Sequence, residues 1–195
     1  MFEYIQGKIA ELTPASVVID NQGVGYFINI SLNTYSALSG KEQAVVFIHQ
    51  VIREDANILF GFFDKSEREI FRQLISVSGV GANTARMMLS SLSSAEIKNA
   101  ILSADTKVLN GIKGIGAKTA QRIIVDLKDK IGKSDISDNF LLTQNNTKRE
   151  EALSALVMLG FAKNPAEKIL DKLLKANPDF EVEELVKQVL KTFSK

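Results

Sequence analysis

Hydrophobic and polar residues alternate along the first part of the chain, in five short segments. The segments are rich in Val, Ile and Phe, which is typical of half-buried β-strands. A polar Asn-Gln-Gly sequence at residues 21–23 supplies a turn between two of them. Several short strands within residues 1–64 predict a small closed or nearly closed barrel. The alternating segments are residues 6–12, 16–20, 25–30, 45–52 and 59–63.

From residue 65 the spacing of apolar residues changes. They recur three or four positions apart, as at Phe71, Leu74 and Ile75, which predicts amphipathic helices within residues 65–132. The sequence Ser66-x-x-Glu69 has the form of a capping box, so we expect the first of these helices to begin there.

Between the helical segments a Gly-x-Gly turn occurs twice, with an offset of 35 residues. Residues 78–85 read Ser-Gly-Val-Gly-Ala-Asn-Thr-Ala, and residues 113–120 read Lys-Gly-Ile-Gly-Ala-Lys-Thr-Ala. Ordinary helix capping explains one such turn, but the repetition predicts two helix-hairpin-helix motifs. Glycine permits backbone angles closed to other residues, and the first amides of the next helix carry the positive end of its dipole. Each hairpin is therefore a candidate site for a phosphate.

The charge distribution agrees with this interpretation. Residues 1–64 carry 3 basic and 7 acidic residues, whereas residues 65–132 carry 11 basic and 6 acidic residues. Lys118 and Arg122 lie one helical turn apart, on one face of the helix expected after the second turn. Basic residues most often form a solvated face, but their coincidence with two phosphate-type turns favours nucleic-acid binding.

The last part of the chain is organised differently. Residues 133–147 are polar and rich in Ser, Asp and Asn, which predicts a flexible linker. Helix start and stop signals then predict three short helices in residues 148–195. So small a module buries little surface and usually binds a partner. The signals are Thr147-x-x-Glu150, Gly160, Asn164-Pro165 and Asn177-Pro178.

Several kinds of chemistry are excluded. The chain has no cysteine and one histidine, His49, so disulfides, iron–sulfur clusters, thiolate zinc sites and histidine-rich metal cages cannot form. We interpret His49 as a polar strand position, because no nucleophile or carboxylate partner lies at a useful spacing. No apolar run is long enough to span a bilayer and no signal pattern opens the chain, so we expect a cytoplasmic protein with no membrane partner and no cofactor.

Two adjacent carboxylates, Glu54 and Asp55, lie between the last two predicted strands. On a hairpin tip they can project together. Spacing alone favours a solvated turn. The alternatives are a magnesium-binding pair, which lacks a third acid nearby, and a negatively charged tip that repels phosphates.

Taken in order along the chain, these features resemble the RuvA family of Holliday-junction-binding subunits of bacterial branch-migration complexes. The most specific matches are the Arg-Glu-Asp-Ala sequence at residues 53–56 and the second hairpin with its helix, residues 113–130. The resemblance covers essentially the whole chain and implies an α+β multidomain fold. Its parts would be an OB-fold-like β-barrel (1–64), a tandem helix-hairpin-helix domain (65–132), a flexible linker (133–147) and a three-helix module (148–195).

The resemblance implies a non-catalytic subunit that binds Holliday junctions by structure and not by sequence. Such a subunit holds the junction open and square-planar and recruits a hexameric RuvB-type ATPase for branch migration in recombination and DNA repair. The implied partners are four-way junction DNA, that ATPase, a junction resolvase and further copies of the chain in a homotetramer. No Gly-x-x-x-x-Gly-Lys-Thr loop that could hold ATP occurs in this sequence.

Site residues follow from the same resemblance. Glu54 and Asp55 match an acidic pin at the junction centre, which helps to separate strands by repelling phosphates. Leu156, Leu159 and Phe161 match the apolar surface that contacts the ATPase. The positions that match DNA-binding residues are Gly79, Gly81, Asn83, Arg86, Gly114, Gly116, Lys118, Thr119 and Arg122.

Asn83 departs from the family pattern, because members commonly carry a lysine in this slot. The first hairpin therefore lacks a phosphate-facing charge, for which Arg86 is the candidate substitute.

Two other classes of function are weaker interpretations. A helix-hairpin-helix DNA glycosylase would use Lys118 as its nucleophile with Asp135 or Asp138, but both aspartates fall in the polar linker. That chemistry also requires neither the second hairpin copy nor the C-terminal module. A single-strand binder could stack bases on Tyr26 and Phe27, but it would need a basic groove, and the barrel segment is net acidic.

Overall fold

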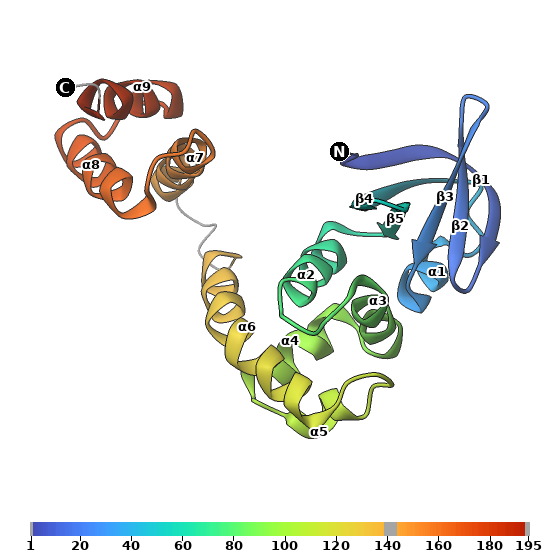
Figure 1. The fold of residues 1–195 in the computed structure, drawn as a ribbon. Helices are drawn as coiled ribbons and strands as arrows, with labels where there is room; N and C mark the ends of the chain where they lie inside the picture. The colour runs from blue at the N-terminus through green and yellow to red at the C-terminus, as the bar shows by residue number, and fades with distance from the viewer. Residues whose placement is uncertain (1, 139–143, 194–195) are drawn as a thin grey trace. The chain divides into compact units, whose positions relative to one another are not determined.

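The structure is a computed structural model that describes residues 2–138 and 144–193 (Figure 1). The chain divides into two units, Met1–Gly132 and Lys133–Lys195. The first unit contains a β-barrel and a helical domain, and the second contains the C-terminal helices.

The barrel is closed and has five strands in the order β1-β2-β3-β5-β4. All neighbouring strands are antiparallel except β3 and β5, which are parallel. Closure leaves no free sheet edge, and this strand number and order are those of an OB-type barrel, so the predicted barrel is confirmed. The strands are β1 (Tyr4–Thr13), β2 (Ser16–Asn21), β3 (Val24–Ile30), β4 (Gln43–Arg53) and β5 (Ala56–Phe62).

A short helix, α1 (Leu32–Leu38), connects β3 to β4. The hydrophobic pattern does not predict it, because a helix of seven residues shows too few turns for a period to emerge. The hydroxyl oxygen of Ser31 caps it by accepting a hydrogen bond from the amide of Thr34 at 3.0 Å.

Five helices follow the barrel and share a core with it. Phe60 and Phe62 of β5 lie in the same buried cluster as Phe71, with ring centroids 5.2 Å and 4.9 Å from the Phe71 ring. The barrel and the helices of the first unit are therefore packed together and do not form separate bodies. The helices are α2 (Lys65–Ile75), α3 (Ala82–Ser91), α4 (Ser94–Leu102), α5 (Thr106–Asn110) and α6 (Ala117–Asp138).

The predicted capping box at Ser66 is wrong. The N-cap of α2 is Asp64, whose carboxylate accepts a hydrogen bond from the amide of Glu67 at 2.7 Å. Asp64 is itself a strong N-cap residue, so the helix begins two residues earlier than the Ser66-x-x-Glu69 pattern suggested.

The segment predicted as a linker, residues 133–147, is partly helical. Helix α6 continues to Asp138, and α7 begins at Gln144. Residues 133–138 contain neither proline nor glycine, so nothing in their backbone stops the helix. Thr147 lies inside α7 and is not its cap. The rest of the predicted linker, residues 139–143, lies outside the described residues.

The C-terminal unit contains the three predicted helices, α7 (Gln144–Met158), α8 (Lys163–Ala176) and α9 (Val182–Phe193). Arg149 ties α7 to α8, because its Nε donates to Asp171 at 2.6 Å and its Nη2 to Glu167 at 2.9 Å. Within the described ranges, no helix is both long and apolar enough to cross a membrane.

Candidate nucleic-acid interface

The two Gly-x-Gly turns have the same backbone geometry. Gly79 and Gly114 both have φ +92°, a left-handed conformation that favours glycine. The amide of Val80 donates to the carbonyl of Val77 at 3.0 Å, and at the equivalent positions the amide of Ile115 donates to Ile112 at 3.0 Å. The repeat seen in the sequence is therefore a repeat in three dimensions, and both helix-hairpin-helix motifs are confirmed.

In each turn, one residue is buried in the core and the glycine that follows it faces open space. Val80 and Ile115, the residues between the two glycines, are each 5% exposed and belong to the buried core of the helical domain. Gly81 and Gly116 face open space, since a Cβ added at either would meet nothing within 4 Å. A phosphate group can therefore approach the backbone at both turns without a side chain in its way.

The start of α3 is free to bind an anion. Its N-cap is Gly81, and no side chain caps the helix. The first amides of a helix have no intrahelical acceptor, so those of α3 are available to a phosphate oxygen. Asn83, the second residue of α3, is exposed, as its predicted role requires.

Two exposed lysines flank the second turn. Lys118 is exposed at the start of α6, and Lys113 is exposed immediately before Gly114. Thr119 is half-buried. Lys113 was not among the predicted DNA-binding residues, although its place next to the turn glycine was a signal in the motif itself.

Arg122 links the two hairpins. Its Nη1 donates a hydrogen bond of 3.1 Å to the carbonyl oxygen of Ser78, in the first turn. A guanidinium has five N–H donors, so this bond leaves the side chain able to contact a phosphate as well. The sequence placed Arg122 next to Lys118 but gave no sign of its contact with the first hairpin.

Arg86 is already engaged within the protein. Its Nη1 donates to the carbonyl of Ala15, in the turn between β1 and β2, at 3.0 Å. Its Nε is buried and has no hydrogen-bond partner in the described part of the chain. Arg86 therefore holds α3 to the barrel, and its predicted contact with DNA stays a prediction.

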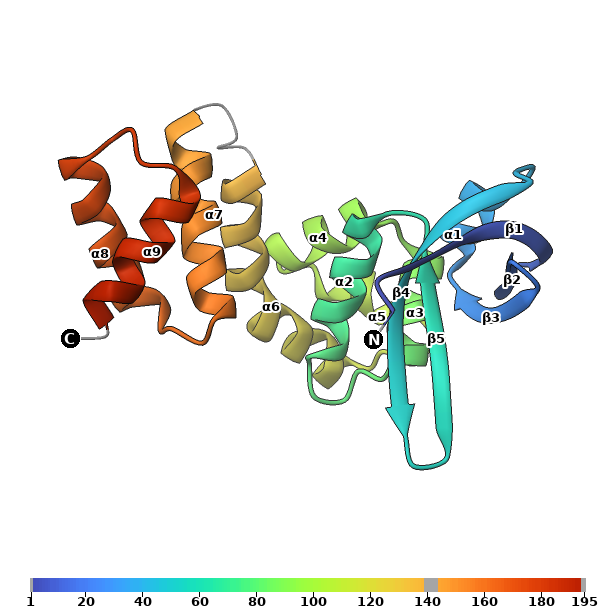
Figure 2. The same cartoon turned by 90° about the horizontal axis from the view of Figure 1, so that it is seen from above.

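Glu54 and Asp55 form the two-residue turn between β4 and β5, because the flanking residues Arg53 and Ala56 are paired. Both are exposed, and Figure 2 shows the β4–β5 hairpin projecting beyond the rest of the barrel. No cluster of three or more acidic or histidine side chains that could hold a metal ion occurs among residues 2–138 and 144–193. The structure thus places two exposed carboxylates at the tip of this hairpin, and their predicted role as an acidic pin stays a prediction.

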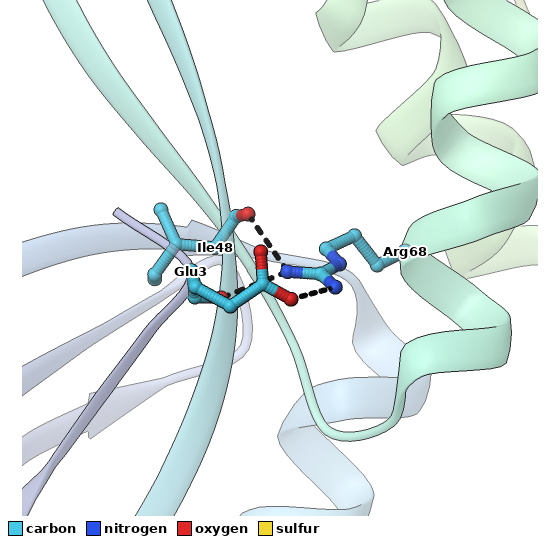
Figure 3. Close-up of polar contacts among 3 residues, drawn as sticks. All are labelled: Glu3, Ile48 and Arg68. Carbon is cyan, nitrogen blue, oxygen red and sulfur yellow. Dashed lines mark hydrogen bonds and ion pairs between the residues drawn. The ribbon is translucent and has the colours of Figure 1, made fainter. Parts of the chain in front are cut away.

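A buried arginine joins the barrel to α2 (Figure 3). Arg68 is 5% exposed, and its Nη1 donates to the carbonyls of Glu3 at 2.8 Å and Ile48 at 3.4 Å. Its Nη2 pairs with the Glu3 carboxylate, and this hydrogen bond lowers the pKa of Glu3. A nearly buried cation is thus matched by a carboxylate and two carbonyls.

A second buried group lies at the same junction. Glu67 is 4% exposed and accepts hydrogen bonds from the hydroxyl groups of Ser31 and, at 2.6 Å, Thr34. Burial raises the pKa of Glu67, against the opposing effect of these two donors. Arg68 and Glu67 together fix α2 to the barrel and to α1.

His49 lies half-buried on β4, with its ring centroid 5.3 Å from that of Phe71. Burial, followed by the charges of Arg72 and Arg68, lowers its pKa. The residue packs between the barrel and α2, in agreement with its interpretation as a strand position.

The expected partner-binding surface of the C-terminal unit needs one correction. Leu156 is fully buried in the core of the three helices, so it cannot form part of an apolar surface. Leu159 is 59% exposed, and its neighbour Met158 is 86% exposed. Phe161 is half-buried against Phe193, with ring centroids 4.9 Å apart. The sequence motif did not separate these residues because it does not give the rotation of α7.

A closed OB-type barrel packed against two helix-hairpin-helix motifs defines a class of protein built to contact the DNA backbone. Family models match in three places: the RuvA N-terminal domain over residues 1–61, a SAM-like helix-hairpin-helix tandem over residues 71–129, and the RuvA C-terminal domain over residues 147–194. The chain belongs to the RuvA family.

Full-length relatives agree with this assignment. The chain is 53% identical to the Holliday junction branch migration complex subunit RuvA of Bacteroides thetaiotaomicron, with 98% of this chain and 99% of the relative aligned. It is 51% identical to the subunit of the same name from Flavobacterium psychrophilum and 50% identical to that of Christiangramia forsetii, at the same coverage.

Proposed function

We propose that this chain binds four-way DNA junctions as the non-catalytic subunit of a branch-migration complex in recombination and DNA repair. The observation that carries the proposal is the pair of hairpins with one backbone geometry, held in a single packed unit with the barrel. The relatives over the full length of the chain are named for the same activity.

Binding at these hairpins is independent of base sequence. The groups available to bind DNA are the backbone amides at Gly81 and Gly116 and a few cationic side chains. Such groups contact phosphates and do not read base edges. Affinity for DNA should therefore fall steeply with salt, the log–log slope growing by about 0.9 for each phosphate neutralised.

In this proposal the acidic turn lies at the centre of the bound junction. Glu54 and Asp55 project together from the β4–β5 hairpin, where their charges repel phosphates and help to keep DNA strands apart at the crossing point. In this role the barrel carries the negative charge and the hairpins carry the positive charge. The sequence has the same distribution, since residues 1–64 are net acidic and residues 65–132 are net basic.

We also propose that the chain assembles as a homotetramer. A four-way junction has four arms, so a homotetramer presents one pair of hairpins to each arm. The exposed apolar residues Met158 and Leu159 of the C-terminal unit are the contact for a RuvB-type hexameric ATPase, which supplies the motor. A junction resolvase is a further partner, and the complex works in the cytoplasm, where the DNA of a bacterial cell lies.

An enzymatic role for Lys118 fits the structure less well. A lysine that forms a Schiff base is activated by desolvation or by a neighbouring cationic group, whereas Lys118 is exposed at the start of α6. Borohydride trapping on abasic DNA tests this alternative, and a covalent adduct lost in Lys118→Ala would establish it.

The proposed function is tested by competition between a four-way junction and linear duplex of equal arm length. The mass of the protein in solution should be measured on the same sample. We expect a tetramer with a strong preference for the junction. Equal affinity for both DNAs would reject junction recognition and leave a general backbone-binding protein.

A further inference from the structure

The helix that follows the first hairpin, α3, is held at its middle by the barrel and at its end by α1. At its middle, Arg86 donates to the carbonyl of Ala15 at 3.0 Å. At its end, the side-chain amide of Asn33, in α1, donates to the carbonyl of Leu89 at 2.7 Å and to that of Leu92 at 3.1 Å. Figure 1 shows α1 lying beside α3.

The contact at Asn33 suits the chemistry of a helix end. The last carbonyls of a helix have no intrahelical donor, and one primary amide supplies two N–H groups. Asn33 therefore satisfies two backbone acceptors at once. A third bond runs beside them, from the amide of Leu32 to the hydroxyl oxygen of Ser90 at 3.1 Å. The end of α3 is thus fixed to α1 by three hydrogen bonds.

The first hairpin is also connected to the second hairpin. The first turn receives the Arg122 hydrogen bond at Ser78, so α3 and its turn stand between the barrel on one side and the second hairpin on the other. The same turn carries Asn83 where the second turn carries Lys118. The first hairpin thus presents fewer positive side chains to DNA than the second. It lies between the barrel and the second hairpin and contacts both.

Selectivity for a junction needs such a connection. A duplex arm and a junction arm present the same phosphates, so a hairpin alone binds both equally. Discrimination requires that the hairpins and the acidic turn Glu54–Asp55 stay at fixed relative positions, because only a junction meets both at once.

We infer that Asn33 is a positioning residue for junction selectivity: by holding the end of α3 against α1, it fixes the first hairpin relative to the barrel that carries the acidic turn. It touches no DNA in this role. The inference rests on the proposed function and adds to it the residue through which the barrel orients the hairpins.

The test compares Asn33→Ala and Asn33→Asp with the wild-type full-length protein. Alanine removes both donors, and aspartate keeps the shape but places a negative charge against two carbonyl oxygens. We expect affinity for the four-way junction to fall by about five- to tenfold, as for the loss of one or two hydrogen bonds. Affinity for linear duplex should stay within about twofold, because the phosphate-binding groups are unchanged.

Asn21→Ala is the matched control. The amide of Asn21 also donates to a backbone carbonyl, that of Gln6 at 2.8 Å, but the bond lies within the barrel. Its junction-to-duplex ratio should equal that of the wild type. Ser90→Ala is a second, milder variant. It removes the acceptor for the Leu32 amide and, within α3, the hydroxyl that donates to the carbonyl of Arg86 at 2.8 Å. It keeps the test decisive if Asn33→Ala does not fold.

The outcomes separate this inference from the proposed function. A wild-type protein that shows no junction preference overturns both. A wild-type preference that persists in Asn33→Ala and Ser90→Ala overturns the inference alone, and so does an equal loss of affinity for junction and duplex, which would indicate a general structural role. A selective loss for the junction supports it.

Discussion

The guanidinium of Arg122, on the helix of the second hairpin, donates a 3.1 Å hydrogen bond to the carbonyl oxygen of Ser78 in the first hairpin. The two residues are 44 positions apart in the sequence. This bond joins the helix that follows the second turn directly to the first turn. Under the proposed function, a pair of turns held in this way meets the DNA backbone as one surface, so the spacing between two phosphates becomes part of what is recognised.

Replacing Arg122 by lysine should separate this structural link from the charge. Lysine keeps the positive charge but lacks the planar fork, so it loses the bond to Ser78. We expect duplex affinity to fall by about fivefold, which corresponds to about 1 kcal/mol for one hydrogen bond. The salt slope should stay nearly constant in Arg122→Lys and fall in Arg122→Met. Titrations at several salt concentrations measure both quantities, and equal behaviour of the two variants would argue against a structural role for the fork.

Lys118 and Asn83 occupy equivalent positions in the two hairpins, so charge can be removed at one and added at the other. Lys118→Ala should lower the log–log salt slope by about 0.9, and Asn83→Lys should raise it by about the same amount. Lys107→Ala, at an exposed lysine of α5 outside both turns, is the control and should leave the slope close to that of the wild type. If Asn83→Lys changes neither slope nor affinity, the first hairpin does not face a phosphate.

The sequence predicts those features that local residues determine. Alternating apolar positions predict the strands, and the repeated glycines predict turns whose shared φ of +92° the structure confirms. Both signals lie within a few residues of the feature that they describe. The short helix α1 escapes prediction because a single capping serine and seven residues leave too weak a pattern.

Contacts between distant residues could not be predicted. Arg86 is of a residue type that commonly binds phosphate, yet its guanidinium donates a hydrogen bond to the carbonyl of Ala15, 71 positions away. Asn33 contacts the end of α3 from 56 and 59 positions away. Such pairs depend on how the barrel packs against the helices, which no local pattern encodes. For the same reason the sequence could not tell that Leu156 points into the core while Met158 points to solvent.

Removing the charges of the acidic turn should change what the complex does with a junction more than how tightly it binds. We expect Glu54→Ala combined with Asp55→Ala to keep or increase junction affinity, because two groups that repel phosphates are lost. Branch migration with the ATPase partner should be altered. Gel shifts and a migration assay on the same preparation measure the two effects. A large loss of junction affinity would show that the turn attracts DNA and does not repel it.

Glu67 should make stability depend on pH. Burial raises its pKa above the ordinary value of 4.5, so the folded state holds the proton more tightly than the unfolded state. The contribution of Glu67 to stability is therefore greatest below about pH 4.5 and decreases as the pH rises through the folded-state pKa. Glu67→Gln has no such titration.

Urea unfolding from about pH 4 to about pH 7.5 tests this prediction. The free energy of unfolding of Glu67→Gln, relative to that of the wild type, should increase with pH over this window. Glu67→Ala should cost about 1–3 kcal/mol, because the buried hydroxyl groups of Ser31 and Thr34 lose their acceptor. A difference between wild type and Glu67→Gln that does not vary with pH would mean that Glu67 keeps an ordinary pKa.

The C-terminal unit offers buried and exposed apolar residues side by side, and their variants should differ in kind. Leu156 is fully buried, so Leu156→Ala should destabilise the three-helix unit by about 2–5 kcal/mol. Met158 and Leu159 are exposed, so Met158→Ser and Leu159→Ser should leave the thermal midpoint unchanged. If this surface binds the ATPase, both serine variants should lose the pull-down of a RuvB-type partner while keeping junction binding, which we assign to the other unit. Retention of the partner by the double serine variant would move the contact to another face of the three helices.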